Sequence, residues 1–180
     1  FMPLCYGGGI KTLDHAKRIF ASGVEKIALN SVVLKNPEFV KQLSQIFGAQ
    51  SIVVSVDVKK DFSGKYKVYD ASQKKLTALD PLEFIKNLQE LGAGEILLNS
   101  VDNDGTMQGY DIELIKTISH QVDIPIIACG GAGQVSDFTK AVKEGGADAV
   151  AAGSMFVFNG KYRAVLLSYP SMEELESIFK

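Results

Sequence analysis

The chain has 180 residues, of which 46% are hydrophobic and 22% are charged, and its formal net charge is -2. These values fit one folded domain with a sizeable core, and they exclude disordered, collagen-like and coiled-coil proteins. Two cysteines are too few for a disulfide scaffold, and no apolar stretch reaches the roughly 18 residues that cross a bilayer. Lysine plus arginine (19) nearly balances aspartate plus glutamate (21), so no basic field favours nucleic acid. We therefore expect a cytoplasmic protein that binds neither nucleic acid nor membranes.

Short β-branched runs alternate with amphipathic helical runs along the chain, which is typical of βα units around a parallel sheet. The six predicted strands are 3–5, 26–30, 52–57, 95–100, 124–129 and 147–152. They lack polar alternation, so we expect both faces of the sheet to be covered. Apolar spacings of three and four predict helices at 37–47, 80–91, 112–118, 138–142 and 171–179. The segment 59–77 is predicted to carry an inserted hairpin, and no linker divides residues 1–180, so we expect a single domain.

The sequence contains an internal repeat at an offset of 123 residues, which aligns Gly7 with Gly130 and Ser31 with Ser154. The repeated glycines stand at equivalent strand-to-helix turns, so we interpret the repeat as a duplication. The block 52–124 has no earlier partner in the chain. Two copies of a four-unit half would make eight units, the number in a TIM barrel. We therefore predict an α/β fold, a (β/α)₈ barrel with a two-fold repeat, of which units 3–8 are present and the two N-terminal units are missing.

Two glycine-rich turns could bind phosphate, because each follows a predicted strand and precedes a helix, where backbone N–H groups can approach an anion closely. The alternative is a tight turn in which only glycine fits. A serine one strand later in each copy favours phosphate binding. The repeat therefore predicts two phosphate sites on opposite sides of the barrel mouth, and a ligand with a phosphate at each end. The residues are Gly8, Gly9 and Ser31 in one copy and Gly130, Gly131 and Ser154 in the other.

Carboxylates also end predicted strands, where barrel enzymes carry their functional groups. Asp57 is the candidate general acid or base, and the alternative is a helix cap or a partner of a neighbouring lysine. Asp104 belongs to a loop whose Gly105 and Thr106 we expect to contact substrate. The loop lacks the ligand spacing of a calcium loop, which argues against a metal site there. We expect neither a metal nor a cofactor.

The other candidates are weaker. Cys5 and Cys129 lie in or just after strands and have no histidine nearby in sequence, so nucleophilic catalysis is not expected. Lys26 and Glu95 stand at the starts of strands, on the opposite face of the barrel. They are either solvated rim residues or an ion pair across the bottom.

With these residues, the chain resembles the cyclase subunit of imidazole glycerol phosphate synthase, the HisF family, over its entire length. The resemblance implies a two-fold repeated (β/α)₈ barrel, in agreement with the repeat. The matching runs include Gly7 to Ile10, Leu29 to Ser31, Val53 to Lys60, Gly92 to Leu98, Asp102 to Thr106 and Gly130 to Gly133.

The resemblance also implies an activity in histidine biosynthesis. Such cyclases use ammonia from a glutaminase subunit, which docks at the N-terminal face of the barrel. They convert a bisphosphorylated ribulosyl intermediate into imidazole glycerol phosphate and an aminoimidazole carboxamide ribonucleotide. By this resemblance Asp57 is a catalytic aspartate, and Lys26 and Glu95 belong to the charged ring that gates ammonia. The implied phosphate contacts are Gly9, Asn30, Ser31, Asp104, Gly105, Gly131, Gly153 and Ser154.

Two alternatives stay open. The segment 156–167 is more similar to HisF-like proteins found with surface-polysaccharide genes, which implies an ammonia-using subunit that amidates a sugar. The chain could instead be a non-catalytic barrel fragment, or a binding subunit that activates a glutaminase. We further expect the 180-residue chain to be inactive alone, because one of the two aspartates of the family's catalytic pair has no counterpart in it.

Overall fold

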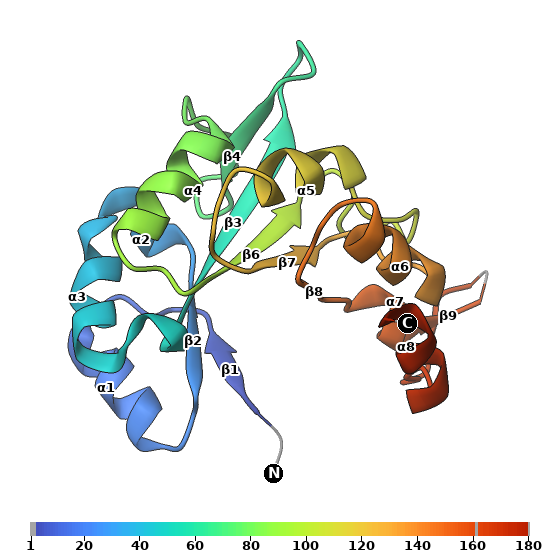
Figure 1. Ribbon diagram of the computed structural model, residues 1–180, viewed down its shortest axis with the longest axis horizontal. Coiled ribbons are helices and arrows are strands. Elements are labelled where there is room, and N and C mark those ends of the chain that lie inside the picture. Colours follow the sequence, from blue (N-terminus) through green and yellow to red (C-terminus); the bar gives the residue numbers. More distant parts are fainter. Residues whose placement is uncertain (1–2, 161, 180) are drawn as a thin grey trace.

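A curved parallel sheet forms the centre of the molecule. The computed structural model describes residues 3–160 and 162–179, so the outermost residues of the expected domain 1–180 lie outside the described part. Six parallel strands follow one another in the sheet without a change of order. They are β1 (Cys5–Gly7), β2 (Lys26–Leu29), β3 (Ile52–Lys60), β6 (Glu95–Ser100), β7 (Ile126–Cys129) and β8 (Ala149–Val150). The sheet bends into an arch with α1, α3, α4, α5 and α6 along its outer side (Figure 1). This architecture fits a partial (β/α) barrel, and all six predicted strands are confirmed.

The helices begin where the sequence offers caps. The Asp80 side chain accepts hydrogen bonds from the backbone N–H groups of Leu82 and Glu83, and Pro81 occupies the first turn. Ser171 and Glu174 form a capping box, in which Ser171 N–H donates to Glu174 Oε2 at 2.8 Å and Glu174 N–H donates to Ser171 Oγ at 3.2 Å. The helices are α1 (Leu13–Ala21), α2 (Ser31–Lys35), α3 (Glu38–Phe47), α4 (Pro81–Glu90), α5 (Ile112–Ser119), α6 (Val135–Lys143), α7 (Ser154–Val157) and α8 (Met172–Phe179), with a 3₁₀ turn at Ala49–Ser51.

Two hairpins extend this framework. The predicted insertion is confirmed: β3 runs on to Lys60 and pairs antiparallel with β4 (Tyr66–Asp70), which pairs with β5 (Lys75–Leu76). A second hairpin, β9 (Phe158–Asn159) with β10 (Ala164–Val165), follows α7 and was not expected from the sequence. Strands of two residues are too short to show a periodic pattern, so their sequence carries no recognisable signal.

The internal repeat is visible in the structure. A shift of 123 residues brings β1, α1, β2 and α2 onto β7, α6, β8 and α7, in the same order and with ends that agree within two residues. Ser31 and Ser154 are each the first residue of a short helix after a parallel strand. The duplication inferred from matching residues therefore holds for the backbone.

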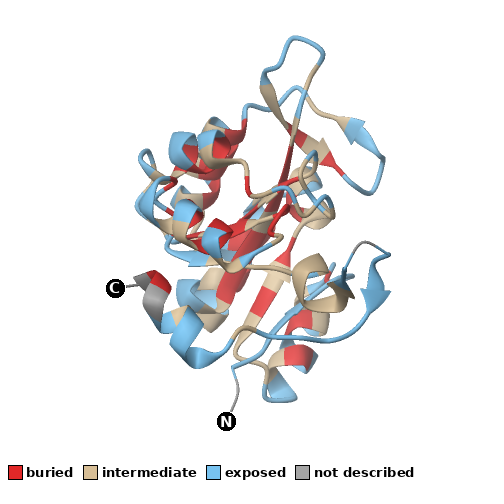
Figure 2. Cartoon of the chain, turned by 90° about the vertical axis from the view of Figure 1, so that its right-hand side faces the viewer, coloured by how far each residue is buried: buried red, intermediate tan, exposed pale blue. Residues whose placement is uncertain are grey.

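The two faces of the sheet are not equally covered. Ile27 and Ile96 point outward toward the helices and are fully buried, each stabilising the fold by about 1.5–3 kcal/mol. Alternate residues of the same strands, such as Lys26 and Asn99, are only half-buried. The expectation of two covered faces is therefore wrong for β2 and β6, because their inner side chains face the concave side of the arch. Figure 2 shows buried residues concentrated in the sheet and its facing helices, and exposed residues on the hairpins. Within the described ranges, no helix has the length and apolar character to cross a membrane.

Candidate functional site

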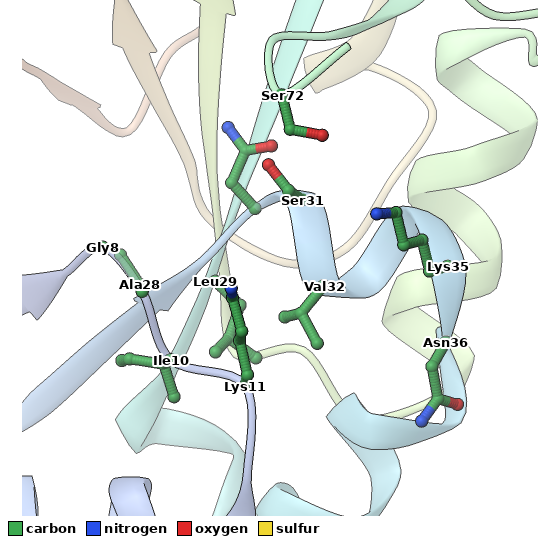
Figure 3. A pocket seen from close by; sticks show the side chains of 12 residues that line it. Gly8, Ile10, Lys11, Ala28, Leu29, Ser31, Val32, Lys35, Asn36 and Ser72 are labelled. Carbon is green, nitrogen blue, oxygen red and sulfur yellow. The ribbon is translucent and has the colours of Figure 1, made fainter.

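The first glycine turn borders an open cavity of about 630 Å³ at the carboxyl ends of β1 and β2. Gly8 and Gly9 follow β1, while Asn30 follows β2 and Ser31 begins α2. All four are predicted site residues, and the structure brings them together. Two cations and a hydroxyl that sequence reasoning missed also line this cavity (Figure 3): Lys11, Lys35 and, from the inserted hairpin, Ser72.

The second glycine turn borders a cavity of only about 30 Å³ at the carboxyl ends of β7 and β8. Six of the predicted site residues line it: Asp104, Gly105, Gly130, Gly131, Gly153 and Ser154. Thr106 is not part of this lining, because its hydroxyl donates to the carbonyl of Asn103 at 2.7 Å within its own loop. The second cavity is far below the size of a small-molecule site, whereas the first cavity falls within that range.

The second turn is held tightly by the loop 103–109. Gly109 N–H donates to the carbonyl oxygen of Gly131 at 2.8 Å, and a Cβ added to Gly131 would lie 2.2 Å from the Gly109 oxygen. Gly131 also has a φ of +112°, which side-chain-bearing residues rarely adopt. The glycines are therefore required by the tight turn itself. This is compatible with phosphate binding, because glycines without side chains also leave their backbone N–H groups accessible to a ligand.

Asp57 lies near the end of β3 and is buried, with 8% of its surface exposed. Its two carboxylate oxygens each accept a hydrogen bond from an asparagine amide: Asn30 Nδ2 on one side and Asn99 Nδ2 on the other, both at 2.9 Å. The neighbouring lysines do not pair with it, since Lys59 lies 3.9 Å from Asp102 and Lys60 lies 3.9 Å from Asp111 and Glu113. The asparagines orient the carboxylate within the concave side of the sheet.

Asn99 was missed by sequence reasoning. Its Oδ1 atom is buried and accepts no hydrogen bond from any described residue, which is costly unless a ligand or water supplies a donor. A Cβ on Gly130 would lie 2.7 Å from this oxygen, so the orphaned acceptor points to the second glycine turn. Strand alternation could have indicated it, because side chains two residues apart, such as Leu97 and Asn99, point to the same face of the sheet. Asn99 is paired with Asp57 on the neighbouring strand.

The cysteines are poor nucleophiles. Cys129 lines the second cavity, and burial, followed by the negative charge of Asp104, raises the pKa of its thiol. Burial and the nearby Glu95 raise the pKa of Cys5. Both groups therefore stay protonated at neutral pH. Across residues 3–160 and 162–179, no three histidine, cysteine, aspartate or glutamate side chains are grouped as metal ligands.

Lys26 and Glu95 form an ion pair at the opposite end of the sheet. Lys26 begins β2 and Glu95 begins β6, and β3 lies between these two strands. The pair interpretation is thus confirmed over the interpretation of two separate rim charges. The inner face of the arch consequently carries an ion pair at the amino ends of its strands and Asp57 with its asparagines at the carboxyl ends.

Comparison with known proteins gives a family match over most of the chain. The model of a family described as "Histidine biosynthesis protein" matches residues 1–163. A Pseudomonas aeruginosa protein, provisionally named imidazole glycerol phosphate synthase subunit hisF2, is 46% identical over 98% of this chain and 70% of its own length. A Vibrio vulnificus protein, provisionally named subunit hisF3 of the same synthase, is 49% identical over 96% and 67%. The imidazole glycerol phosphate synthase subunit HisF of Alkaliphilus metalliredigens is 45% identical over 88% and 63%. The family match includes both glycine turns and Asp57.

Proposed function

The chain belongs to the family of histidine biosynthesis proteins, and from this we propose that it is the cyclase subunit of imidazole glycerol phosphate synthase. It would use ammonia to convert a bisphosphorylated ribulosyl aminoimidazole-carboxamide intermediate into imidazole glycerol phosphate and an aminoimidazole carboxamide ribonucleotide. The similarity to proteins named as subunits of this synthase supports the proposal.

The observation that carries the proposal is the arrangement at one edge of the sheet. Two glycine turns, related by the repeat, border cavities at the carboxyl ends of the strands. Asp57 lies on β3, between the strands that carry the two cavities. A ligand with a phosphate at each end would span this edge with its reactive centre over Asp57. Gly8, Gly9, Asn30 and Ser31 would bind one phosphate, and Asp104, Gly105, Thr106, Gly130, Gly131, Gly153 and Ser154 would line the other site.

In this proposal Asp57 is the general acid or base. The amides of Asn30 and Asn99 fix the carboxylate plane, so that its remaining lone pairs face the ligand. The free Oδ1 of Asn99 would accept a hydrogen bond from a donor on the substrate. Ammonia would enter between Lys26 and Glu95, from a glutaminase subunit docked at the amino ends of the strands, and we place the complex in the cytoplasm.

We also propose that residues 1–180 belong to a single barrel domain and that two βα units precede them in the native protein. Support comes from the repeat, because β3 and β6 have no counterpart at the offset of 123 residues within the sequence. Measuring the intact mass of the native protein tests this point: a mass equal to that of 180 residues would contradict it.

The proposed catalysis is tested with the intact native protein, ammonium salts and the ribulosyl bisphosphate. Asp57→Asn should lower turnover by about 10²–10⁴-fold, because it removes the acid–base group while its size is kept. Asp102→Asn is the matched control, since Asp102 lies in the turn after the neighbouring strand β6 and its carboxylate accepts a hydrogen bond from the Lys60 backbone N–H instead of facing Asp57's partners. Unchanged turnover in Asp57→Asn would show that Asp57 is not the acid–base group, whereas no turnover by the folded unmodified protein would favour a non-catalytic binding subunit that activates a glutaminase.

A second candidate function is the amidation of a polysaccharide sugar by the same ammonia-using architecture. The hairpin β9–β10 favours it, because the corresponding segment of the sequence resembles HisF-like proteins associated with surface polysaccharides. A folded intact protein that leaves the ribulosyl bisphosphate unchanged but transfers ammonia to a nucleotide-linked sugar would replace the first proposal with this one.

A further inference from the structure

The two cavities differ in the charges that line them. The first has two lysines in its wall, Lys11 and Lys35. The second has no lysine or arginine among its lining residues, and it carries the carboxylate of Asp104. A phosphate dianion seated there would meet backbone N–H groups, the Ser154 hydroxyl and a repelling carboxylate. A cation beside the second cavity would therefore favour phosphate binding there.

Arg163 lies at the border of this cavity. Its Nη1 donates a hydrogen bond to the carbonyl oxygen of Gly105 at 3.1 Å, and Gly105 itself lines the cavity. The guanidinium also rests on the Phe158 ring, 4.6 Å from its centroid. Arg163 directly precedes β10, and Phe158 begins β9, so the unexpected hairpin carries both the cation and the ring that holds it.

From these contacts we infer that Arg163 is a ligand-binding residue of the second cavity and contacts the phosphate group bound there. The inference rests on the proposed function, which places a phosphate in each cavity. A guanidinium has five N–H donors in one plane, and within the described residues this one uses a single hydrogen bond, to Gly105. The remaining donors can bind phosphate while the contact with Gly105 persists.

Three properties of Arg163 bear on a role in phosphate binding. The positive charge offsets Asp104, which otherwise disfavours an anion. The aromatic ring under the guanidinium limits its freedom before binding, which reduces the entropy lost on binding. The backbone of Arg163 has a φ of +49°, uncommon for a residue with a side chain, so the hairpin holds a strained conformation at this position.

The experiment is a titration of the intact native protein with inorganic phosphate, followed by NMR. The backbone amides of Gly105 and Ser154 report on the second cavity, and those of Gly9 and Ser31 report on the first. The Arg163 side-chain Nε–H signal is assigned by its absence from the spectrum of Arg163→Gln. We expect the Arg163 Nε–H signal to shift with the same midpoint as Gly105 and Ser154.

Arg163→Gln should then weaken phosphate binding at the second cavity by about tenfold, the loss expected for one charged hydrogen bond. Binding at the first cavity should not change. Arg18→Gln, which alters an exposed residue of α1, should change neither. Arg163→Lys should retain part of the affinity, because it keeps the charge but loses the planar fork.

The outcomes separate the inference from the proposed function. If Gly105 and Ser154 shift with unchanged affinity in Arg163→Gln, the role of Arg163 is wrong while the phosphate site stands. If Arg163 only fastens the hairpin, its Nε–H signal will not move and the Lys and Gln variants will lose affinity equally. If phosphate shifts neither pair of reporters in the unmodified protein, both the inference and the proposed phosphate sites are wrong.

Discussion

The two glycine-turn cavities derive from equivalent stretches of a duplicated sequence, yet they have become different sites. The first cavity is open, about 630 Å³, and its glycines have free space where a Cβ would lie. The second is about 30 Å³, and the loop 103–109 presses against Gly130 and Gly131. Duplication has kept the turns and the serines, while the surroundings of each turn have diverged.

The comparison teaches where each site obtains its positive charge. Lys11 and Lys35 of the first cavity belong to the repeated block itself, next to its glycine turn and its serine helix. Arg163, whose guanidinium contacts Gly105 at the border of the second cavity, lies beyond the repeated block, in the terminal hairpin. In both cavities the repeated turns supply the backbone N–H groups. The positive charge comes from residues that differ between the two copies or lie beyond the repeat.

The largest expected contrast concerns the glycines. Gly131→Ala should lower the free energy of unfolding by about 3–5 kcal/mol, because it combines a strained φ with a clash against the Gly109 carbonyl. Gly9→Ala, at φ +71° with open space around it, should cost only about 1 kcal/mol. Urea unfolding of both variants measures the difference. Equal losses would mean that the two turns are equally constrained.

A second contrast separates the two asparagines that hold Asp57. Asn99→Ala should lower kcat by about tenfold, because it removes one hydrogen bond of about 1–2 kcal/mol that positions the carboxylate. Asn30→Ala should raise KM as well, since Asn30 also lines the first cavity. Steady-state kinetics of the intact protein test both variants. An Asn99→Ala enzyme with normal kcat would remove Asn99 from the positioning role.

A third, smaller effect concerns the first cavity alone. Lys35→Gln should weaken phosphate binding there by about two- to fivefold, as expected for an exposed ion pair of up to about 1 kcal/mol. The second cavity should keep its affinity. The Gly9 and Ser31 amides report the change, and Lys41→Gln on α3 serves as a control away from the cavity wall. A change at Gly105 or Ser154 would show that the two cavities are coupled.

The smallest effect concerns pH. The pKa of Cys129 is raised in the folded protein, first by burial and then by Asp104, whereas the unfolded thiol titrates near 9.0. The stability contributed by the neutral thiol is therefore complete below about pH 9 and is lost as the pH rises toward the folded pKa. Cys129→Ser should lose less stability than the unmodified protein between pH 8 and 10 in thermal unfolding. Identical slopes would contradict the raised pKa.

Much of the fold was predictable because long apolar runs determine strands whatever their neighbours are. β6 has the predicted bounds, and β3 begins at the predicted residue. At the ends of the sheet, the bounds of a strand depend on which residues pair with the neighbouring strand. β1 begins at Cys5 rather than Pro3, because its pairing with β2 begins at Lys26. β8 has only two of its six predicted residues, Ala149 and Val150, both paired with β7. These limits depend on partners distant in sequence.

The site was predictable in part for the same reason. Glycines and serines at repeated strand ends, together with Asp57, could be found from spacing alone. The amide of Asn99, the side chain of Ser72 and the contact of Arg163 with Gly105 could not, because they join residues that are 42 to 58 positions apart or belong to an inserted hairpin. A repeat search also overlooks residues that differ between the copies, and those are the ones that distinguish the two cavities.

The ion pair between Lys26 and Glu95 has a mechanical consequence. It joins the two strands that flank β3, which would lie about 9.5 Å apart in a flat sheet. Asn30 and Asn99 join the same two strands through Asp57 at the other end. β2 and β6 are therefore linked across β3 at both ends, and both links depend on the curvature of the sheet. Any motion that breaks the ion pair between Lys26 and Glu95 should therefore also change the distance between Asn30 and Asn99, which hold Asp57 between them.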